Sequence, residues 1–373
     1  ADAKGELPVD TGFIVFNHRT YPVFTRFLKK LGVEEQDSDM SFSYYDSSAN
    51  FQYSSDFPNG VFADRRNIFR PSFYAMFKDI MRFNRSVKVD FYAGRLKDKT
   101  LGQYLNANSY GGAFVRHYLT PMAAAIWSAP LKKIMDFPCD TFIRFYENHG
   151  ILDMGHGVEW KTVKGGSQTY VRSFLNGFKG MVYTSRAAVE IERADGVNIR
   201  LSDGTTEIAD AVVIATHADQ ALRLLKDPTA DERRLLGPWQ YSKNHTALHT
   251  DPSRMPSSRR AWVSWNYIKS EKHDFSSPVS LTYYMNRLQR LSASRDYFVS
   301  LNQKGLMGED RIVYQTYYEH PQYDFSSIDT QKSLPSLNGP GNTYFCGSYF
   351  GYGFHEDGAR AALSVCERLG ATL

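Results

Sequence analysis

The sequence predicts an α/β fold with a second domain, and three observations support this prediction. An unbroken apolar run at 211–215, AVVIA, is followed by a polar turn and an apolar helical pattern, as expected for a buried parallel strand and its crossover helix. Residues 343–369 repeat that order of strand, glycine-rich loop and helix. The length of 373 residues leaves room for the long intervening segments to form a second domain.

The first third of the chain is expected to mix strands and helices. Residues 7–17, LPVDTGFIVFN, form a β-rich run, and a helix is predicted from Pro22 with Gly32 as its stop. Its apolar side chains recur at helical spacing, so one face should be buried. Strand-like alternation then covers 41–63, and helical periodicity covers 70–130.

The middle of the chain carries the clearest hairpin signal. Residues 187–204, AAVEIERADGVNIRLSDG, alternate in strand fashion around two Asp-Gly turns, at 195–196 and 203–204. A glycine turn at 165–167 and an amphipathic helix precede this hairpin, and strands are expected again within 278–320. The middle and the end of the chain should therefore contribute to one α/β domain.

The closing segment can be read in two ways. Gly353 and Gly358 are five residues apart, which does not match the GxGxxG dinucleotide fingerprint. Glu356 and Asp357 lie in the first turn of the expected helix, where acidic groups suit the positive end of its dipole. The segment could be the last strand and helix of a cofactor-binding sheet, or a glycine-rich connection without a ligand; the pattern alone leaves both open.

Composition excludes some partners. The net charge is only +4, and no basic run with interleaved aromatics indicates nucleic-acid binding. No apolar run reaches the 18 residues of a membrane span, and the N-terminus does not resemble a signal peptide. The three cysteines, Cys139, Cys346 and Cys366, form no CxxC motif and fit a reduced, cytoplasmic protein.

Several motifs together resemble a known family. They are VDTGFIVFN, AAAIWSAP, VKGGSQTYV, VVIATHADQALRLL, YYMNRLQ and FCGSYFGYGFHEDGARAAL, which run through nearly the whole chain. They are similar to FAD-dependent oxidoreductases, described as predicted NAD/FAD-binding proteins, of the amine oxidase and phytoene desaturase superfamily. The resemblance implies a Rossmann-like FAD-binding domain and a second α+β substrate domain.

The resemblance also implies a departure from the family pattern. In that family a strand, GxGxxG and a first helix precede the segment that matches VDTGF, and here only nine residues precede Asp10. We therefore expect the FAD-binding domain to be incomplete at its N-terminus, in a truncated form of a longer flavoprotein. A natural variant that cannot hold FAD in the usual way is the alternative.

Carried over position by position, the resemblance assigns residues to FAD. The turn after the first strand should lie near the flavin and pyrophosphate, a hairpin valine near the adenine, the end of the 211–215 strand near the adenosine, and the closing loop near the ribityl chain and the pyrimidine edge. These positions are Asp10, Thr11, Gly12, Phe13, Val189, Ala215, Thr216, His217, Gly347, Ser348, Tyr352, Gly353, Phe354 and Glu356. Ser348 departs from the acidic residue of many relatives, although a serine can still bond the ribityl hydroxyls.

Catalytic and substrate residues are less clearly marked. His355 lies beside the predicted flavin edge and could shuttle a proton, or it could bond its own loop. The aromatic and polar residues Trp127, Tyr283, Tyr284 and Asn286 are candidates for a substrate wall, or for an aromatic core and a capped turn. The pairs His245/His249 and His149/His156 lack a carboxylate at ligand spacing, so no metal site is expected.

These observations lead to one domain division and two classes of function. The FAD-binding domain is expected at 1–40, 160–235 and 335–373, and the substrate domain at 41–159 and 236–334. The first class is a flavoenzyme that transfers hydride from an apolar substrate, an amine or an unsaturated fatty acyl chain, to FAD. The second is a non-catalytic fragment that binds a partner or ligand without FAD, and an oligomer or a missing N-terminal segment is compatible with either.

Overall fold

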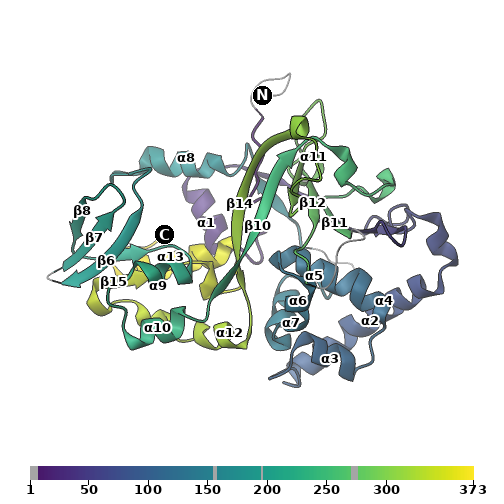
Figure 1. Ribbon diagram of the computed structural model, residues 1–373, viewed down its shortest axis with the longest axis horizontal. Helices are drawn as coiled ribbons and strands as arrows, with labels where there is room; N and C mark the ends of the chain where they lie inside the picture. The colour runs from purple at the N-terminus through teal and green to yellow at the C-terminus, as the bar shows by residue number, and fades with distance from the viewer. Residues whose placement is uncertain (1–6, 154–157, 195, 270–275) are drawn as a thin grey trace. The chain divides into compact units, whose positions relative to one another are not determined.

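A computed structural model describes residues 7–153, 158–194, 196–269 and 276–373, and the chain folds into two compact units (Figure 1). Unit 1 comprises residues 1–20, 34–169 and 242–320. Unit 2 comprises residues 21–33, 170–241 and 321–373. Each unit is therefore assembled from three separate segments of the chain, so its core depends on contacts between residues far apart in sequence.

A seven-stranded sheet forms the centre of unit 1. Its strand order is β14-β10-β13-β12-β11-β3-β4, and the β11–β3 pair is parallel, whereas β10–β13, β13–β12, β12–β11 and β3–β4 are antiparallel. In the same order the strands are Ile312–Gln322, Gln240–His249, Phe298–Leu301, Leu281–Tyr284, Trp265–Lys269, Phe42–Asp46 and Phe51–Ser54. The sheet is mixed because β3 comes from the start of the chain and β11 from its last third.

Helices and a small second sheet complete unit 1. The helices are α2 (Pro71–Tyr92), α3 (Leu101–Ala107), α4 (Gly112–Phe114), α5 (Thr120–Trp127), α6 (Leu131–Met135), α7 (Cys139–Asn148) and α11 (Met285–Leu288). The second sheet has the order β1-β5-β2, formed by Val15–Phe16, Lys161–Val163 and Glu35–Asp37. This small sheet joins the N-terminal segment to β5, and so positions the turn at Asp10.

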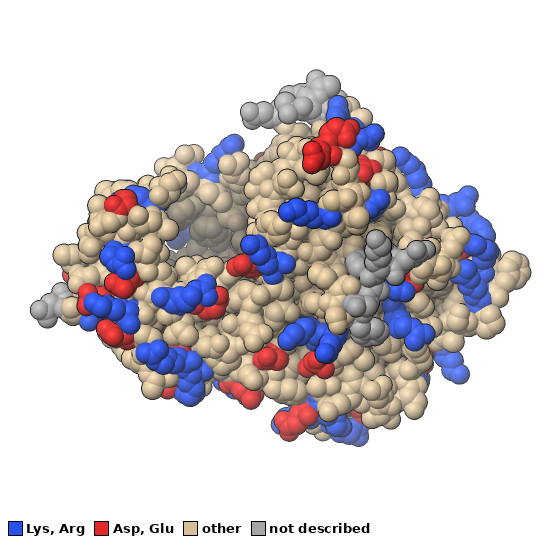
Figure 2. Space-filling model, viewed as in Figure 1, with Lys and Arg blue, Asp and Glu red and all other residues tan. Residues whose placement is uncertain are grey.

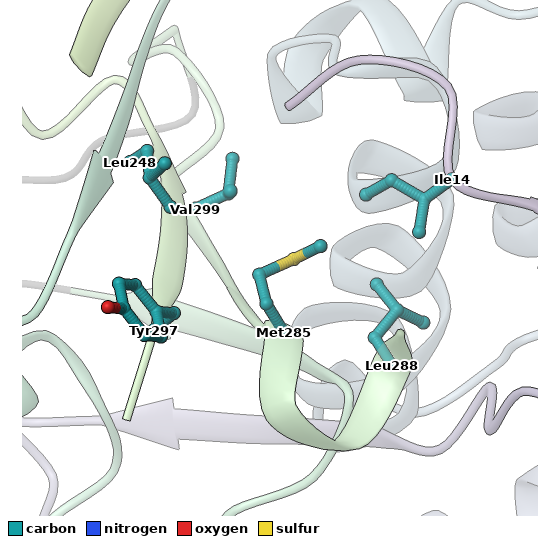
Figure 3. Close-up of a cluster of buried hydrophobic side chains, with 6 residues drawn as sticks. All are labelled: Ile14, Leu248, Met285, Leu288, Tyr297 and Val299. Carbon is teal, nitrogen blue, oxygen red and sulfur yellow. The ribbon is translucent and has the colours of Figure 1, made fainter. Parts of the chain in front are cut away.

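One buried cluster joins these parts of unit 1 (Figure 3). Met285 and Leu288 project from α11 toward Ile14, which comes from the N-terminal segment. Leu248 and Val299 enter the same cluster from β10 and β13. The cluster thus packs the segment that follows Asp10 against the central sheet through α11.

Unit 2 contains a two-stranded parallel sheet and a three-stranded antiparallel sheet. Strands β9 (Val212–Ile214) and β15 (Thr343–Phe345) are parallel, and β6 (Ala188–Ala194), β7 (Gly196–Leu201) and β8 (Thr206–Ala209) form the antiparallel sheet. The helices are α1 (Pro22–Lys30), α8 (Gln168–Gly177), α9 (Ala218–Leu224), α10 (Ala230–Leu236), α12 (Phe325–Gln331) and α13 (His355–Arg368).

Most local predictions are confirmed. The parallel strand at 211–215, the hairpin, the helix at Pro22 and the closing strand, loop and helix all form. The β-rich run at 7–17 yields only the two-residue strand β1, and the turn expected at Asp195 lies outside the described residues. Residues 1–20 and 34–40 belong to unit 1 rather than to the unit with the parallel sheet, and which unit binds FAD stays a prediction.

Candidate functional site

The carboxyl ends of β9 and β15 place two loops at one edge of unit 2. Because the strands are parallel, with Val212 opposite Thr343, the loops that follow both of them leave the sheet on the same side. A Cβ on Gly347 would lie 3.3 Å from the backbone oxygen of Thr216 and 2.6 Å from the ring of Tyr349. Glycine therefore permits the close approach of the two loops. We call residues 347–354 the closing loop.

A buried carboxylate holds the closing loop to its helix. Asp357 accepts hydrogen bonds from the backbone N–H groups of Tyr352 (2.9 Å) and Phe354 (3.0 Å), and it is also paired with Arg360. A Cβ on Gly351 would lie 2.1 Å from an oxygen of this carboxylate, so glycine leaves the space that Asp357 fills. Burial raises the pKa of Asp357, and the hydrogen bonds and Arg360 offset that rise in part.

Gly353 is required by the backbone of the closing loop itself. Its φ of +90° lies in the region that favours glycine, and a Cβ there would meet the Tyr323 hydroxyl at 2.7 Å and Pro321 at 3.1 Å. This requirement exists without any ligand. The loss of a cofactor on substitution of Gly353 would therefore not by itself show that Gly353 contacts the cofactor.

Glu356 caps a different helix. Its two carboxylate oxygens accept hydrogen bonds from the backbone N–H groups of Val23 (3.0 Å) and Phe24 (2.9 Å), in the first turn of α1. Carboxylates stabilise helix N-termini because unpaired N–H groups and the helix dipole meet there. The predicted role of Glu356 at a cofactor stays a prediction, and the structure gives this residue a structural task.

An apolar cavity of about 620 Å³ opens beside the closing loop within unit 2. It is bounded by α1, α13, the closing loop and the end of the chain; its lining includes Phe24, Phe27, Tyr170, Ser348, Phe354, His355, Ala359, Ala362 and Leu363. Small residues on the α13 face leave this space, and aromatic rings from α1 enclose it. Cavities of this size and polarity are typical small-molecule sites.

His355 is the titratable group of this cavity that the sequence predicted. Its Nε2 atom lies 3.1 Å from the hydroxyl of Tyr170, and its ring meets Phe24 edge-on at 4.7 Å. Burial lowers the pKa of His355 to about 4, so the imidazole is neutral at pH 7. A neutral His355 can accept or donate a hydrogen bond, whereas a cationic role at neutral pH is disfavoured.

The residues predicted for the adenosine and the adenine lie just after β9 and on β6 in unit 2. Ala215 and Thr216 follow β9, and His217 stacks on Tyr241 with ring centroids 4.1 Å apart. Val189 lies on β6 with 40% of its surface exposed. Their roles at FAD stay predictions.

The predicted residues 10–13 belong to unit 1, where a polar network fixes the first of them. We call these residues the Asp10 loop. The Asp10 carboxylate accepts bonds from the Ser167 N–H (2.9 Å) and the Gln289 side-chain amide (3.0 Å), and the Asp10 N–H donates to Gln289 Oε1 (3.0 Å). Burial raises the pKa of Asp10, and the bonds from Ser167 oppose that rise. Three motifs of the sequence, VDTG, GGS and YYMNRLQ, therefore meet at this carboxylate.

Thr11 and Gly12 contact the long strand β14. The Thr11 hydroxyl lies 2.7 Å from the hydroxyl of Tyr318, and a Cβ on Gly12 would touch the same ring at 3.7 Å. Phe13 stacks on Phe16 with ring centroids 6.5 Å apart. The backbone of the Asp10 loop is thus held on both sides within unit 1.

The four residues predicted for a substrate wall are all in unit 1, with structural contacts of their own. Trp127 is 5% exposed and packs against Phe137 and Phe145 at 4.8 Å, as the aromatic-core alternative expects. The remaining three make cross-strand and turn contacts: Tyr283 lies edge-on to Trp265 at 4.9 Å, Tyr284 donates to Asp296 at 2.7 Å, and Asn286 accepts from the Tyr297 N–H and donates to the Arg295 carbonyl. A substrate role for them stays a prediction.

Three of the four paired histidines make hydrogen bonds to protein groups. His249 Nε2 lies 2.7 Å from the Ser300 hydroxyl, and burial lowers its pKa to about 4. His245 lies 3.2 Å from Gln315, and His149 lies 2.9 Å from the Phe145 carbonyl. His156 lies outside the described residues, and among the residues that are described no group of three or more His, Cys, Asp or Glu is placed to hold a metal ion.

Sequence reasoning missed three residues that organise these loops. Tyr170 faces His355 from α8, Asp357 holds the closing loop, and Gln289 clamps the Asp10 loop from 279 residues away. Asp357 carried a local signal as an acidic residue of the first helical turn. The partners of Tyr170 and Gln289 are far away in sequence, and no local pattern indicates them.

Comparison with known families decides the class of this protein. The family model for flavin-containing amine oxidoreductases matches residues 2–370. The chain belongs to this family. No curated protein matches the sequence. As a flavin-containing amine oxidoreductase the protein uses FAD, which is the cofactor that the motifs predicted.

Solved structures share the fold of this flavin-containing amine oxidoreductase at low sequence identity. A putative protoporphyrinogen oxidase from Exiguobacterium sp. 255-15 matches with a TM-score of 0.65 at 13% identity, covering 99% of this chain and 89% of that one. Cyclohexylamine oxidase from Brevibacterium oxydans matches with a TM-score of 0.62 at 13% identity, covering 99% and 90%. A fatty acid isomerase from P. acnes that produces CLA matches with a TM-score of 0.63 at 11% identity, covering 98% and 88%. These matches confirm the mixed α/β fold.

The described residues fit an FAD cofactor in two respects. The loops after the parallel strands β9 and β15 share one edge of the sheet. The 14-residue helix α13 begins directly after the closing loop, so its dipole favours an electron-rich group there. That this chain is a truncated form of a longer flavoprotein, without the GxGxxG unit, stays a prediction. None of the described helices is long and apolar enough to cross a membrane.

Proposed function

We propose that the protein oxidises or isomerises an apolar substrate, an unsaturated fatty acyl chain or an amine, by hydride exchange with FAD bound beside the closing loop. The observation that carries the proposal is the apolar cavity of about 620 Å³, which contains His355 and adjoins the closing loop. Bound FAD would supply the electron acceptor, which no protein side chain provides. The residues of the chain would bind and orient both groups.

The walls of the cavity support an apolar occupant. Phe24, Phe27, Ala362 and Leu363 offer no hydrogen-bond donors, so an apolar ring or chain would replace water there at little cost. The fatty acid isomerase among the structural neighbours acts on a lipid and the cyclohexylamine oxidase on an amine; these two substrate classes are the leading candidates. The high aromatic content, 14% of residues, favours the lipid.

His355 and Tyr170 would hold the exchangeable protons of this cavity. Because His355 is neutral at pH 7, its Nε2 and the Tyr170 hydroxyl share one hydrogen bond, whose direction depends on the tautomer. The pair would orient a polar headgroup, and it would keep water from the apolar end. Ser348, at the start of the closing loop, would donate to the cofactor as the ribityl partner that the resemblance implies.

Stopped-flow mixing tests the proposal directly. The FAD-loaded protein is mixed without oxygen with unsaturated fatty acids and, separately, with amines, and the visible flavin absorbance is followed. Loss of absorbance with one class, or isomerised product without net loss, supports the proposal. His355→Gln should slow the productive class by about 100-fold if the imidazole takes part in proton transfer. The proposal would be contradicted if neither the fatty acids nor the amines changed the flavin absorbance and neither class was converted to product.

A second candidate function is favoured by one surface of unit 2. Helix α8 has no buried residue; Val171, Phe174, Leu175 and Phe178 on and just after it are each 40–45% exposed. Val213 in the parallel strand β9 is also 43% exposed, although such strands are normally covered on both faces. These residues support the alternative that this chain binds a partner through unit 2. Concentration-dependent assembly without bound flavin would favour that alternative.

A further inference from the structure

Large apolar side chains protrude from one segment of unit 1. Phe57 is 81% exposed and Phe69 is 85% exposed, while Ile68 and Tyr74 are 42% and 50% exposed. Single exposed apolar residues are common, but two nearly fully exposed phenylalanines within thirteen residues mark a contact surface. We call residues 57–74 the arm surface.

Two hydrogen bonds link the parts of the arm surface to one another. Arg65 donates to the Asn59 side chain at 3.3 Å, which joins the loop after Phe57 to the 3-10 turn at 65–69. The Tyr74 hydroxyl donates to the Ile68 carbonyl at 2.9 Å, which joins that turn to α2. Phe57 and Phe69 therefore project from neighbouring parts of a fixed frame.

The arm surface is also basic. Asp64 is buried and forms ion pairs with Arg66 (2.9 Å) and Arg70 (3.7 Å), whereas Arg65 donates a hydrogen bond to the neutral Asn59. The other nearby carboxylate, Asp56, pairs with Arg287 at 2.8 Å, and Arg287 also pairs with Asp39 at 2.8 Å. Residues 57–74 thus contain three arginines, of which Arg66 and Arg70 share the carboxylate of Asp64, and the surface keeps an excess positive charge.

The surrounding segment extends this charge. Residues 51–100 contain ten Lys and Arg against five Asp and no Glu, a net charge of +5, which exceeds the +4 of the whole chain. Figure 2 shows Lys and Arg side chains gathered along the right-hand edge, over the part of the chain that contains α2. A partner of this surface should therefore be negatively charged and should offer an apolar layer beneath its charges.

We propose that the arm surface binds the face of an anionic lipid bilayer. The arginines would meet lipid phosphates, and Phe57 and Phe69 would insert into the boundary between headgroups and acyl chains. A soluble polyanion offers the charge without the apolar layer, and an apolar protein groove offers the apolar layer without the charge. The protein would sit on the membrane without crossing it, because no helix in the described ranges is suited to span one.

Co-sedimentation with vesicles tests the proposal. The protein is spun with phosphatidylcholine vesicles and with vesicles that contain phosphatidylglycerol as well. We expect binding to the anionic vesicles that falls as salt is added. The double variant Phe57→Ser/Phe69→Ser should bind at least about tenfold more weakly, since two phenylalanines lose their burial in the bilayer. The matched control is Tyr92→Ser, which removes a 72% exposed ring from the other end of α2 and should bind like the wild type.

A charge variant supplies the second arm of the test. Arg65→Gln should weaken binding to the anionic vesicles by about fivefold, in keeping with roughly 1 kcal/mol for each basic residue near an anionic surface. It should not change the sedimentation with neutral vesicles. The proposal would be overturned if the protein did not bind the anionic vesicles, or if the phenylalanine double variant bound them as tightly as the wild type. It would also be overturned if soluble heparin released both proteins from the vesicles to the same extent.

Discussion

The Asp10 loop of unit 1 and the start of α13, just after the closing loop of unit 2, differ in the surroundings of their partly buried polar groups. Asp10 accepts hydrogen bonds from Ser167 and Gln289 in a polar network. His355 stands at an apolar cavity of about 620 Å³, with Tyr170 and Phe24 as its described contacts. The Asp10 loop is a satisfied structural clamp, whereas the start of α13 borders space for a ligand.

This difference indicates where chemistry belongs. A residue whose donors and acceptors are all engaged within the protein stabilises the fold, and its removal should cost stability first. A residue beside an open apolar cavity can exchange its partner for a ligand, and its removal should change binding or rate first. The closing loop and the first turn of α13 nevertheless contain both kinds of residue, because Asp357, Glu356 and Gly353 hold the frame around the cavity.

The largest expected effect tests whether the closing loop needs Gly353 for its own folding, independently of a ligand. Gly353→Ala should lower the free energy of unfolding by about 3 kcal/mol, because the new Cβ adds a clash with the buried Tyr323 to the cost of a positive φ. Gly305→Ala is the control, since Gly305 has a φ of +73° and open space around its Cβ position; it should cost about 1 kcal/mol. Urea unfolding measures both. Equal losses would contradict the close approach at Gly353.

A smaller effect tests the clamp at the Asp10 loop. Asp10→Ala leaves the Ser167 N–H and the Gln289 amide without their acceptor, so the free energy of unfolding should fall by about 2 kcal/mol. The control Asp136→Ala removes an exposed carboxylate from the end of α6 and should cost less than about 0.5 kcal/mol. If Asp10→Ala unfolded at the same urea concentration as the wild type, the network would not be a structural clamp.

The smallest effect concerns the pH dependence of unit 1. Burial opposes the ionisation of Asp39, but bonds from Arg287, Ser41 and Ser264 outweigh it and lower the pKa of Asp39 to about 2. Stability from this carboxylate is therefore complete above its ordinary pKa near 4 and is lost as the pH falls toward 2.

We expect this contribution to be about 1 kcal/mol, after allowance for solvent around a one-third exposed side chain. Asp39→Asn should flatten the loss of stability between pH 4 and pH 2, as measured by urea unfolding at several pH values. The buried carboxyls at the start of α13, Glu356 and Asp357, have raised pKa values, so their contribution to stability has the opposite sign and declines as pH rises. If the free energy of unfolding of Asp39→Asn fell between pH 4 and pH 2 as steeply as that of the wild type, the assigned pKa of Asp39 would be contradicted.

Local pattern predicted much of unit 2 and little of how unit 1 is assembled. The strand at 211–215, the hairpin and the closing unit were recognisable because each is a short run with its own turn residues. The seven-stranded sheet was not predicted, because its β11–β3 pair joins Trp265 to Phe42 across more than two hundred residues. The aromatic surroundings of Trp127 and the Gln289 partner of Asp10 are likewise tertiary contacts, which periodicity does not contain.

The most direct test of the account is the affinity of the closing loop for FAD. The protein is purified, the released cofactor is identified by chromatography, and FAD binding is titrated by visible absorbance for the wild type, Ser348→Ala and the control Ser336→Ala, an exposed serine of unit 2. The account predicts FAD in the wild type and in Ser336→Ala, with about tenfold weaker binding in Ser348→Ala because one hydrogen bond to the cofactor is lost. Identical affinity in all three proteins would contradict the placement of FAD at the closing loop, and a wild type that binds no FAD would contradict the proposed function as a whole.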